Sequence, residues 1–425
     1  MTIKEQAAVM KLNSTKMAVT TLEERNRALE GIREALLAHK EEIFKANKED
    51  MERAGKEGIA APILKRLKFQ EEKLQEVTTG ILDLIGLPDP LGKEQMRREL
   101  DTDLLLIRES CPIGVIGVIF EARPDAMVQI ASLCIKSGNC AILKGGSEAM
   151  KTNKKIFEII YQAAAAAGMP ENCMFQIEAR SDITELLECH DSVDLLIPRG
   201  SNEFVQYIMN HTKIAVMGHA DGICHIYADK TLDLDKAIPV ILDSKTQYTA
   251  VCNATETLLV HKEIAGELLP RLNEALRAKN VEVRGTKEVR QIVECEPATE
   301  EDFSTEYLDL IISVKIVEDI QEAVDHINKY GSHHTDCILT EDPKAARLFM
   351  QYVDSAGVYQ NCSTRFADGY RYGFGAEVGI STGKLHARGP VGLEGLCTYK
   401  YKLFGNGNIV ADYAEGRKQF HFKDL

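Results

Sequence analysis

Apolar residues recur at helical spacing among charged residues over the first part of the chain. They include Ala8, Leu12, Ala18, Leu22, Ala28, Ile32, Leu36, Ile43 and Phe44. This pattern predicts a long amphipathic helical region from Lys4 to about Asn47, with a break near Asn13. A second helix is predicted over residues 70–84, because the Gly and Pro residues of the following "GLPDPLG" stop it.

From Cys111 onward, apolar runs of strand length alternate with helical segments. The run "PIGVIGVIF" is almost entirely apolar, as expected for a strand covered on both faces. Further runs follow at "CAILK", "CMFQI", "VDLLIP" and "KIAVM". Repeated βα units predict a parallel, doubly wound sheet that binds ligands at the carboxyl ends of its strands.

A second βα series follows "ICHIYAD", with strands expected at "TLLVH", "VEVRG", "DLIISVKIV" and "DCILT". The fold class is therefore α/β, with two doubly wound parallel-sheet domains. The segment 97–110 predicts a two-stranded hairpin, which is either an edge that pairs with another chain or a surface flap. Glycine is frequent over residues 365–395, which predicts a loop-rich crossover.

Charge and composition narrow the function. Lys and Arg total 51 against 65 Asp and Glu, and the net charge of -14 argues against nucleic acid or an anionic membrane as a partner. The N-terminal stretch is charged throughout and lacks the features of a signal peptide, so we expect a cytoplasmic protein. The eleven cysteines contain no CxxC pair and no metal-ligand spacing, so we expect reduced thiols and no metal site.

The stretch "LKGGSEAMKTN", residues 143–153, is the first candidate for chemistry. Lys144 ends a predicted strand, two glycines make a turn, and Ser147 is expected as the N-cap of a helix. Backbone N–H groups at such a helix start attract phosphate, and the lysine adds a positive charge or hydrogen bonds to a ribose. The alternative is a capped turn with a solvated lysine.

A second turn of the same kind lies in "LIPRGSNEF", residues 196–204. Gly200 lets a ligand approach the backbone, and Ser201 is placed to cap the next helix. Two such turns at successive strand ends predict a cleft for a phosphate-containing cofactor. Neither turn matches the GxGxxG motif or the P-loop.

Cys252 is the third candidate, on a polar step before a strand of the second series. Gln247 and Tyr248 precede the cysteine, and Asn253 and Thr255 follow it. Such a position can stabilise a reactive thiolate, whereas the alternative is an ordinary buried thiol.

Nearly the whole chain resembles the aldehyde dehydrogenase superfamily, and within it the branch that reduces glutamyl phosphate. Six segments carry the resemblance in order: "PIGVIGVIFEARPD", "AILKGGSEA", "GHADGICHIYAD", "CNATETLLVH", "YGSHHTDCILTED" and "GISTGKLHARGPVGLEGL". The resemblance implies an NADP-binding domain over 1–95 and 112–228 and a catalytic domain over 229–364. It also implies an oligomerisation flap over 97–110 and 396–425, joined by the crossover 365–395.

The resemblance also assigns residues to the cofactor and the reaction. Cys252 matches the nucleophile, and Lys144 matches the lysine at the adenosine ribose. Gly200 and Ser201 match the turn beside the nicotinamide half of the cofactor, and Ser147 in the first turn is a further cofactor-binding candidate. Glu306, in "STEYLDLIISV", lies where the family has the glutamate that holds the nicotinamide ribose, although the Phe-Gly-Pro expected next is absent.

Three departures from related enzymes are informative. Hydrolytic members carry a water-activating glutamate where "MGHADG" begins here, and that position holds no carboxylate. They also carry an oxyanion asparagine where this chain has "FEARP", so the Cys252 backbone N–H or Asn253 are the candidates for that role. His333 stands where the branch has glycine, and is either a solvated loop residue or a group that narrows the cleft.

The activity implied by the resemblance is reduction of L-glutamyl 5-phosphate to L-glutamate 5-semialdehyde with NADPH, through a thioester on Cys252. Arg123 is a candidate contact for the acyl phosphate or a structural ion pair, and His219 is a candidate cleft residue or a core histidine. The expected partners are the small acyl phosphate, a separate glutamate 5-kinase and further copies of the chain. The alternatives are a hydrolytic or coenzyme A-acylating aldehyde dehydrogenase, or a catalytically silent scaffold.

Overall fold

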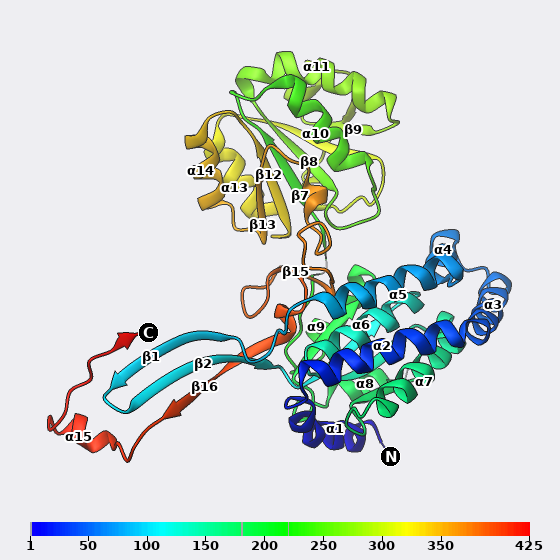
Figure 1. Ribbon diagram of the computed structural model, residues 1–425. Helices are drawn as coiled ribbons and strands as arrows, with labels where there is room; N and C mark the ends of the chain where they lie inside the picture. Colours follow the sequence, from blue (N-terminus) through cyan, green and yellow to red (C-terminus); the bar gives the residue numbers. More distant parts are fainter. Residues whose placement is uncertain (1, 180–181, 220) are drawn as a thin grey trace. The chain divides into compact units, whose positions relative to one another are not determined.

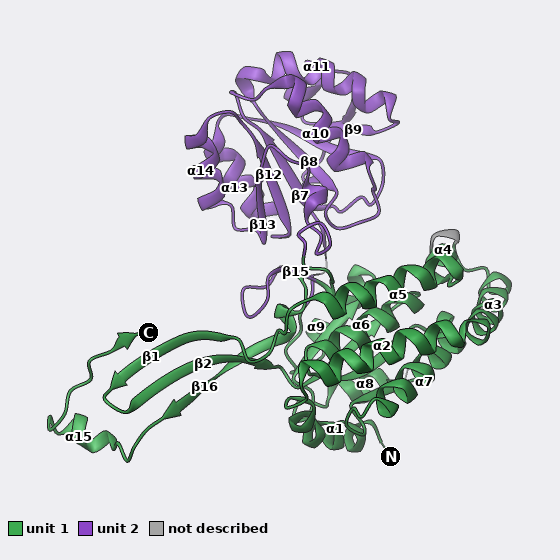
Figure 2. Cartoon of the chain, viewed as in Figure 1, with its two compact units in different colours: residues 1–217, 374–379, 391–425 green, residues 218–373, 380–390 purple. Residues whose placement is uncertain are grey.

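The computed structural model describes residues 2–179, 182–219 and 221–425 (Figure 1). The chain forms two compact units (Figure 2). Unit 1 contains residues 1–217, 374–379 and 391–425, and unit 2 contains residues 218–373 and 380–390. In the part of the chain that the structure describes, no helix combines the length and apolarity needed to cross a bilayer.

Unit 1 begins with five helices, which are α1 (Ile3–Met17), α2 (Leu22–Ala38), α3 (Lys40–Lys56), α4 (Ala61–Leu67) and α5 (Glu71–Gly86). The break expected near Asn13 is wrong, because α1 continues to Met17 and the chain breaks before Thr21 instead. Thr21 and Glu24 form a capping box there, which satisfies the first N–H groups of α2 and fixes where that helix starts. The helix predicted over 70–84 is confirmed by α5.

The parallel sheet of unit 1 has the strand order β5-β4-β3-β6. Its strands are β3 (Val115–Phe120), β4 (Cys140–Gly145), β5 (Met174–Ile177) and β6 (Leu195–Arg199). The helices of these βα units are α6 (Pro124–Lys136), α7 (Met150–Ala166), α8 (Asp182–Leu187) and α9 (Asn202–Asn210). Every residue of β3 is buried, as the apolar sequence predicted. The strand expected at "KIAVM" is reduced to one bridge between Val216 and Leu196.

A separate antiparallel sheet contains the predicted hairpin and the C-terminal region. Its order is β16-β2-β1-β17, with β1 (Glu94–Asp101), β2 (Leu104–Pro112), β16 (Cys397–Phe404) and β17 (Lys423–Asp424). Asp103 turns the hairpin with a positive φ of 58°. The short helix α15 (Val410–Ala414) lies between the last two strands. We call the region 94–112 and 397–425 the flap.

Unit 2 has a parallel sheet of order β10-β9-β11-β8-β7-β12-β13. The strands are β7 (Cys224–Ala228), β8 (Thr255–His261), β9 (Glu282–Gly285), β10 (Glu296–Pro297), β11 (Ile311–Val317), β12 (Thr335–Leu339) and β13 (Gly357–Gln360). The helices are α10 (Leu234–Thr246), α11 (Lys262–Ala278), α12 (Lys287–Arg290), α13 (Ile320–Tyr330) and α14 (Pro343–Tyr352).

Two apolar clusters cover the two faces of this sheet. Ile226 and Leu258 belong to one cluster, and their chain neighbours Tyr227 and Leu259 belong to the other. Because successive side chains of a strand point to opposite faces, both faces of β7 and β8 are covered. This arrangement confirms the predicted α/β class with doubly wound parallel sheets.

The glycine-rich segment is loop-rich, as predicted. It contains the short helices η3 (Thr364–Phe366) and η4 (Glu394–Leu396). The short strands β14 (Gly379–Ser381) and β15 (Gly389–Val391) pair with each other.

Candidate functional site

Cys252 lies on a turn between α10 and β8 in unit 2, and it is half-buried. Gly222 allows the chain to pass directly against this turn. A Cβ atom at position 222 would come within 2.2 Å of both the Cα and the carbonyl oxygen of Cys252. Only glycine fits there, so the close approach fixes the backbone that carries the sulfur.

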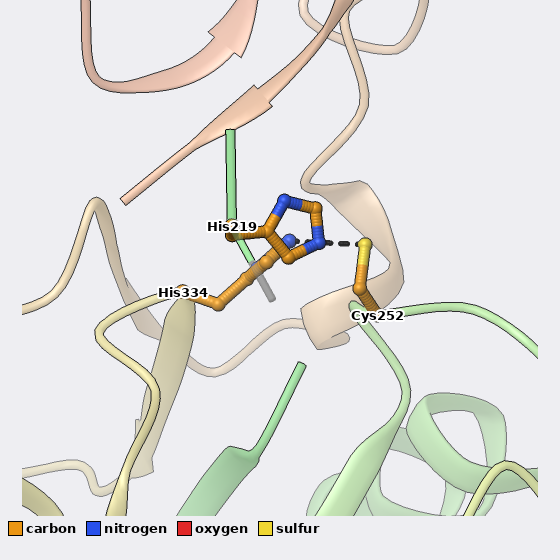
Figure 3. Close-up of side chains that lie close together, drawn as sticks. All are labelled: His219, Cys252 and His334. Atoms are coloured by element: carbon orange, nitrogen blue, oxygen red, sulfur yellow. Dashed lines mark hydrogen bonds between the residues drawn. The ribbon is translucent and has the colours of Figure 1, made fainter. Parts of the chain in front are cut away.

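His334 is the nearest polar partner of that sulfur. Its Nε2 atom lies 3.2 Å from the Cys252 Sγ atom (Figure 3). The imidazole is buried just before β12, and its Nδ1 atom lies 2.9 Å from the hydroxyl of Thr335. A thiol in contact with an imidazole can pass its proton to the ring, which is the arrangement that activates a cysteine nucleophile.

His219 adds a second imidazole to the same place. Its ring packs edge to face against His334 with 5.1 Å between ring centroids, and Figure 3 shows both rings beside the sulfur. The Nδ1 atom of His219 lies 3.0 Å from the carbonyl oxygen of Ile380. Because a carbonyl oxygen only accepts, this contact places the ring proton on Nδ1.

The segment around η3 is fastened to the Cys252 turn through Asn253. The Thr364 hydroxyl donates to the Asn253 carbonyl oxygen at 2.7 Å, and the Asn253 amide donates to the Ala367 carbonyl oxygen at 2.9 Å. Asn253 is buried, and this hydrogen bond helps to fix the orientation of its side chain.

Arg365, on the same segment, brings a buried positive charge toward the turn. Its Nε atom donates to the Gln247 side-chain oxygen at 2.9 Å, and the residue is 8% exposed. Burial lowers the pKa of the guanidinium, and the neighbouring Arg371 lowers it further, while the Cys252 thiol favours the charged form. The guanidinium thus interacts electrostatically with the candidate nucleophile.

A buried ion pair lies behind the turn. The Lys245 Nζ atom is 2.5 Å from a Glu256 carboxylate oxygen, and both side chains are fully buried. The pKa of Glu256 is raised to about 7, mainly by burial and in part by nearby Glu306, while Lys245 lowers it. Glu306, the expected ribose contact, therefore lies within electrostatic reach of this pair.

Lys144 and Ser147 lie at the carboxyl end of β4 in unit 1, but the expected cap is wrong. Ser147 does not cap α7, because it begins a 3₁₀ turn (η1, Ser147–Ala149) and the N-cap of α7 is Ala149. The alternative of a solvated lysine does not hold either, since Lys144 is 4% exposed and donates to the Gly145 carbonyl oxygen.

The start of α7 is also occupied, contrary to the expected phosphate site. The Asp50 carboxylate, from α3, accepts from the backbone N–H groups of Lys151 at 3.3 Å and Thr152 at 2.8 Å. This distant carboxylate takes the place of a phosphate at the helix start. The sequence could not predict it, because Asp50 reaches the turn only through the tertiary fold.

The second turn is likewise filled by a carboxylate. Ser201 is the N-cap of α9 as predicted, although its hydroxyl makes no cap hydrogen bond. Its backbone N–H donates to Glu121 at 3.0 Å, and a Cβ atom at Gly200 would come within 2.5 Å of the same carboxylate. In the first turn, Glu148 similarly accepts from the Ala122 N–H at 2.6 Å.

Arg123 and His333 are held by local contacts. Arg123 forms an ion pair with Asp125 at 3.3 Å at the start of α6. His333 has a positive φ of 60°, and its Nδ1 atom lies 2.6 Å from the Asp354 carbonyl oxygen. Its neighbour His334, rather than His333, is the histidine that contacts the sulfur.

Sequence reasoning missed His334, Gly222, Arg365 and the Lys245–Glu256 pair. His334 and Gly222 both lie in quoted family motifs, so the signal was available for them. Arg365 and the buried ion pair have no local signature, because their significance comes from burial. At the position of the hydrolytic glutamate, the structure has the buried apolar side chain of Met217.

Comparison with known proteins shows which family the chain belongs to. A family model described as the aldehyde dehydrogenase family matches residues 2–292. The chain is 57% identical over 420 residues to a gamma-glutamyl phosphate reductase of Acetivibrio thermocellus, covering 99% of this chain and 97% of the relative. It is 56% identical over 403 residues to gamma-glutamyl phosphate reductase 1 of Synechocystis, covering 95% and 93%.

Solved structures give the same answer. A crystal structure of gamma-glutamyl phosphate reductase from Thermotoga maritima has a TM-score of 0.93 and 40% identity, and the match covers 95% of this chain and 99% of that one. A propionaldehyde dehydrogenase from Rhodopseudomonas palustris shares the fold, with a TM-score of 0.65 at 15% identity over 94% of this chain and 96% of that one. The chain therefore belongs to the aldehyde dehydrogenase family, and within it to the group of gamma-glutamyl phosphate reductases.

Proposed function

We propose that the protein reduces L-glutamyl 5-phosphate to L-glutamate 5-semialdehyde and phosphate with NADPH, the second step of proline biosynthesis. The observation that carries the proposal is the 3.2 Å contact between Cys252 and His334, in a chain 57% identical to a gamma-glutamyl phosphate reductase. In this assignment unit 2 carries the nucleophile, and the parallel sheet of unit 1 binds the cofactor.

The first chemical step belongs to Cys252. As the sulfur attacks the acyl carbon, the His334 Nε2 atom accepts the thiol proton, and phosphate leaves with the electrons of the broken C–O bond. The product is a thioester on Cys252. The backbone N–H of Cys252 and the Asn253 amide are the candidates to stabilise the developing oxyanion, and the amide has a second N–H besides the one that donates to Ala367.

The residues at the strand ends of unit 1 fit a ribose-bearing cofactor. The Glu121 and Glu148 carboxylates accept hydrogen bonds beside the glycine turns. Ribose hydroxyls donate hydrogen bonds, so these two carboxylates suit a ribose better than they suit a phosphate group. Lys144, Gly200 and Ser201 are the other cofactor-binding candidates in unit 1. Glu306 in unit 2 is the candidate that binds the nicotinamide ribose. When bound, the nicotinamide supplies the hydride that reduces the thioester.

We assign Arg365 as the cation that receives the anionic substrate. It is buried, held by Gln247, and interacts with the charge of Cys252. Arg123 is a second candidate contact for the acyl phosphate, although Asp125 already pairs with it. His219 packs against His334 beside the Cys252 sulfur in unit 2 and is a further candidate substrate contact.

The apolar side chain at Met217 supports reduction over hydrolysis. A carboxylate at that position would activate water against the thioester, and methionine cannot act as a base. The acyl group is thereby kept for reduction.

The proposal is tested in the reverse direction, with semialdehyde, NADP⁺ and inorganic phosphate. The expected result is phosphate-dependent reduction of NADP⁺, which Cys252→Ala abolishes while circular dichroism stays unchanged. Turnover that needs coenzyme A instead of phosphate, or that survives in Cys252→Ala, would refute the assignment. Equal rates with NAD⁺ and NADP⁺ would refute the NADPH preference alone.

Partners follow from the same chemistry. An acyl phosphate must be made by a kinase, so we propose functional coupling to a separate glutamate 5-kinase. We also propose that the flap joins copies of the chain. It exposes Tyr401 and Leu403 on β16, an edge strand of the flap sheet, and edge strands pair readily with other chains.

A further inference from the structure

We propose that His219, Cys252 and His334 form a binding site for a borderline-soft divalent cation, with Zn²⁺ as the natural occupant. One ligand atom from each residue lies within 4.8 Å of the others. Figure 3 shows the two imidazoles and the sulfur converging on one point. The inference concerns these side chains alone and does not depend on the identity of the acyl substrate.

The ring contacts give the two imidazoles the orientation of metal ligands. Each imidazole uses Nδ1 for an oxygen of its own surroundings, which is the Ile380 carbonyl for His219 and the Thr335 hydroxyl for His334. Metal-binding histidines are held in this way, with one nitrogen bonded to a protein oxygen and the other directed at the metal. The second nitrogen of His334 is the one that lies 3.2 Å from the sulfur.

The ligand set favours zinc. Two imidazoles and one thiolate match the borderline-soft character of Zn²⁺, and three protein ligands leave a fourth tetrahedral position for water. The three residues lie far apart in the sequence, which is why cysteine spacing predicted no metal site. The cluster forms only when the loops before β7, β8 and β12 come together in the fold.

Cys224 is the nearest other sulfur and is not part of the set. Its thiol donates to the Cys252 carbonyl oxygen at 3.2 Å and lies 3.9 Å from Nδ1 of His334. Nδ1 is on the opposite side of the ring from the nitrogen that meets Cys252.

A Zn²⁺ ion bound at this site would block the Cys252 nucleophile reversibly. Zn²⁺ displaces the thiol proton to solvent and forms a bond with the Cys252 sulfur, whose electron pair is then unavailable to attack a carbonyl. Removing the metal and returning a proton restores the thiol with no net oxidation or reduction. The site thus protects the thiol and inhibits the enzyme at the same time.

The test uses Co²⁺ as a spectroscopic probe on the reduced, metal-free full-length chain. A single site is expected, with a thiolate-to-cobalt charge-transfer band and the visible spectrum of tetrahedral Co²⁺, and one equivalent of Zn²⁺ should displace it. Cys252→Ser should remove the charge-transfer band. His219→Ala and His334→Ala should each weaken binding about tenfold or more.

Two matched variants control for other histidines and thiols. His333→Asn removes the neighbouring imidazole and keeps a residue that tolerates a positive φ, and Cys295→Ser removes another half-buried thiol. Both should keep the band and the affinity. The proposal is overturned if no thiolate band appears in excess Co²⁺, if the band survives Cys252→Ser, or if either control loses it while its circular dichroism matches wild type.

Discussion

The Nε2 atom of His334 lies 3.2 Å from the Sγ atom of Cys252, whereas the adjacent His333 turns away to the Asp354 carbonyl oxygen. Two consecutive histidines therefore have separate roles. One contacts the nucleophile, and the other holds the loop. The pair allows a test in which the control differs from the variant by a single position.

Replacing His334 should slow the reaction at the sulfur. We expect His334→Gln to lower kcat/KM by about 10²- to 10⁴-fold, because a positioned proton acceptor contributes roughly that much. The rate at which iodoacetamide alkylates Cys252, followed by peptide mass spectrometry, should fall as well. His333→Asn should change neither quantity, and an unchanged alkylation rate in His334→Gln would contradict the assigned role.

Gly222 should be intolerant of any side chain. In Gly222→Ala the new Cβ atom would meet the Cα and carbonyl oxygen of Cys252 at 2.2 Å, so the nucleophile must move. A displacement of about 1 Å costs on the order of 100-fold in rate, which steady-state kinetics would detect.

The matched control for that variant is Gly266→Ala in α11. A Cβ atom at position 266 has nothing within 4 Å, and alanine favours the helix by about 0.5–1 kcal/mol. Its activity should equal that of wild type. Comparable activity in both variants would show that the Gly222 contact does not position the sulfur.

Breaking the buried Lys245–Glu256 pair should destabilise the protein. Lys245→Met leaves a buried carboxylate without its cation, which costs about 3–5 kcal/mol. The double variant Lys245→Met/Glu256→Leu removes both charges and should recover most of that loss. Urea unfolding curves give the free energies, and a double variant as unstable as the single one would count against this explanation.

Most of the architecture could be predicted from the sequence, for identifiable reasons. The apolar run of β3 is long enough to require cover on both faces, and Gly and Pro mark the end of α5. The two short strands around the polar turn at Asp103 could also be predicted. These are local signals, and the structure agrees with them.

The occupants of the two turns could not be predicted, because they come from residues distant in sequence. The expected phosphate site at α7 is occupied by Asp50, and the Ser201 N–H is occupied by Glu121. No local pattern could indicate that a carboxylate from another element would arrive there. The family motif "YGSHHT" draws attention to His334, but its contact with Cys252 is seen only in the structure, where β8 and β12 belong to the same sheet.

His326 should make the protein sensitive to acid. Neither ring nitrogen has a hydrogen-bond partner among the described residues, and burial lowers the pKa of the imidazole to about 3. The unfolded chain, with an ordinary pKa near 6.5, binds more protons between pH 3 and 6.5, so stability is lost as the pH falls through that window. The slope from this group is about 1.4 kcal/mol per pH unit.

The variant that tests this is His326→Phe, which keeps a ring against Phe303 and Tyr330. It should lose less stability than wild type between pH 8 and pH 5, with a difference of about 2 kcal/mol. Urea unfolding at the two pH values measures it. Parallel losses in both proteins would mean that another group titrates.

The flap should control assembly. Tyr401 and Leu403 are each 56% exposed on β16, and we expect Tyr401→Glu/Leu403→Glu to lower the mass measured by light scattering after size exclusion. Tyr352→Glu, at an equally exposed tyrosine in α14, should leave the mass unchanged. An unaltered mass in the flap variant would remove the flap from the interface.

Two hydrogen bonds, from Thr364 and Asn253, fasten η3 to the Cys252 turn. The order of synthesis decides when these bonds can form. The cysteine leaves the ribosome before its histidine, and both leave before residues 364–367. A nascent chain that ends before residue 364 therefore lacks the two hydrogen bonds that hold the Cys252 turn. That turn can gain its full support only once residues 364–367 have been made.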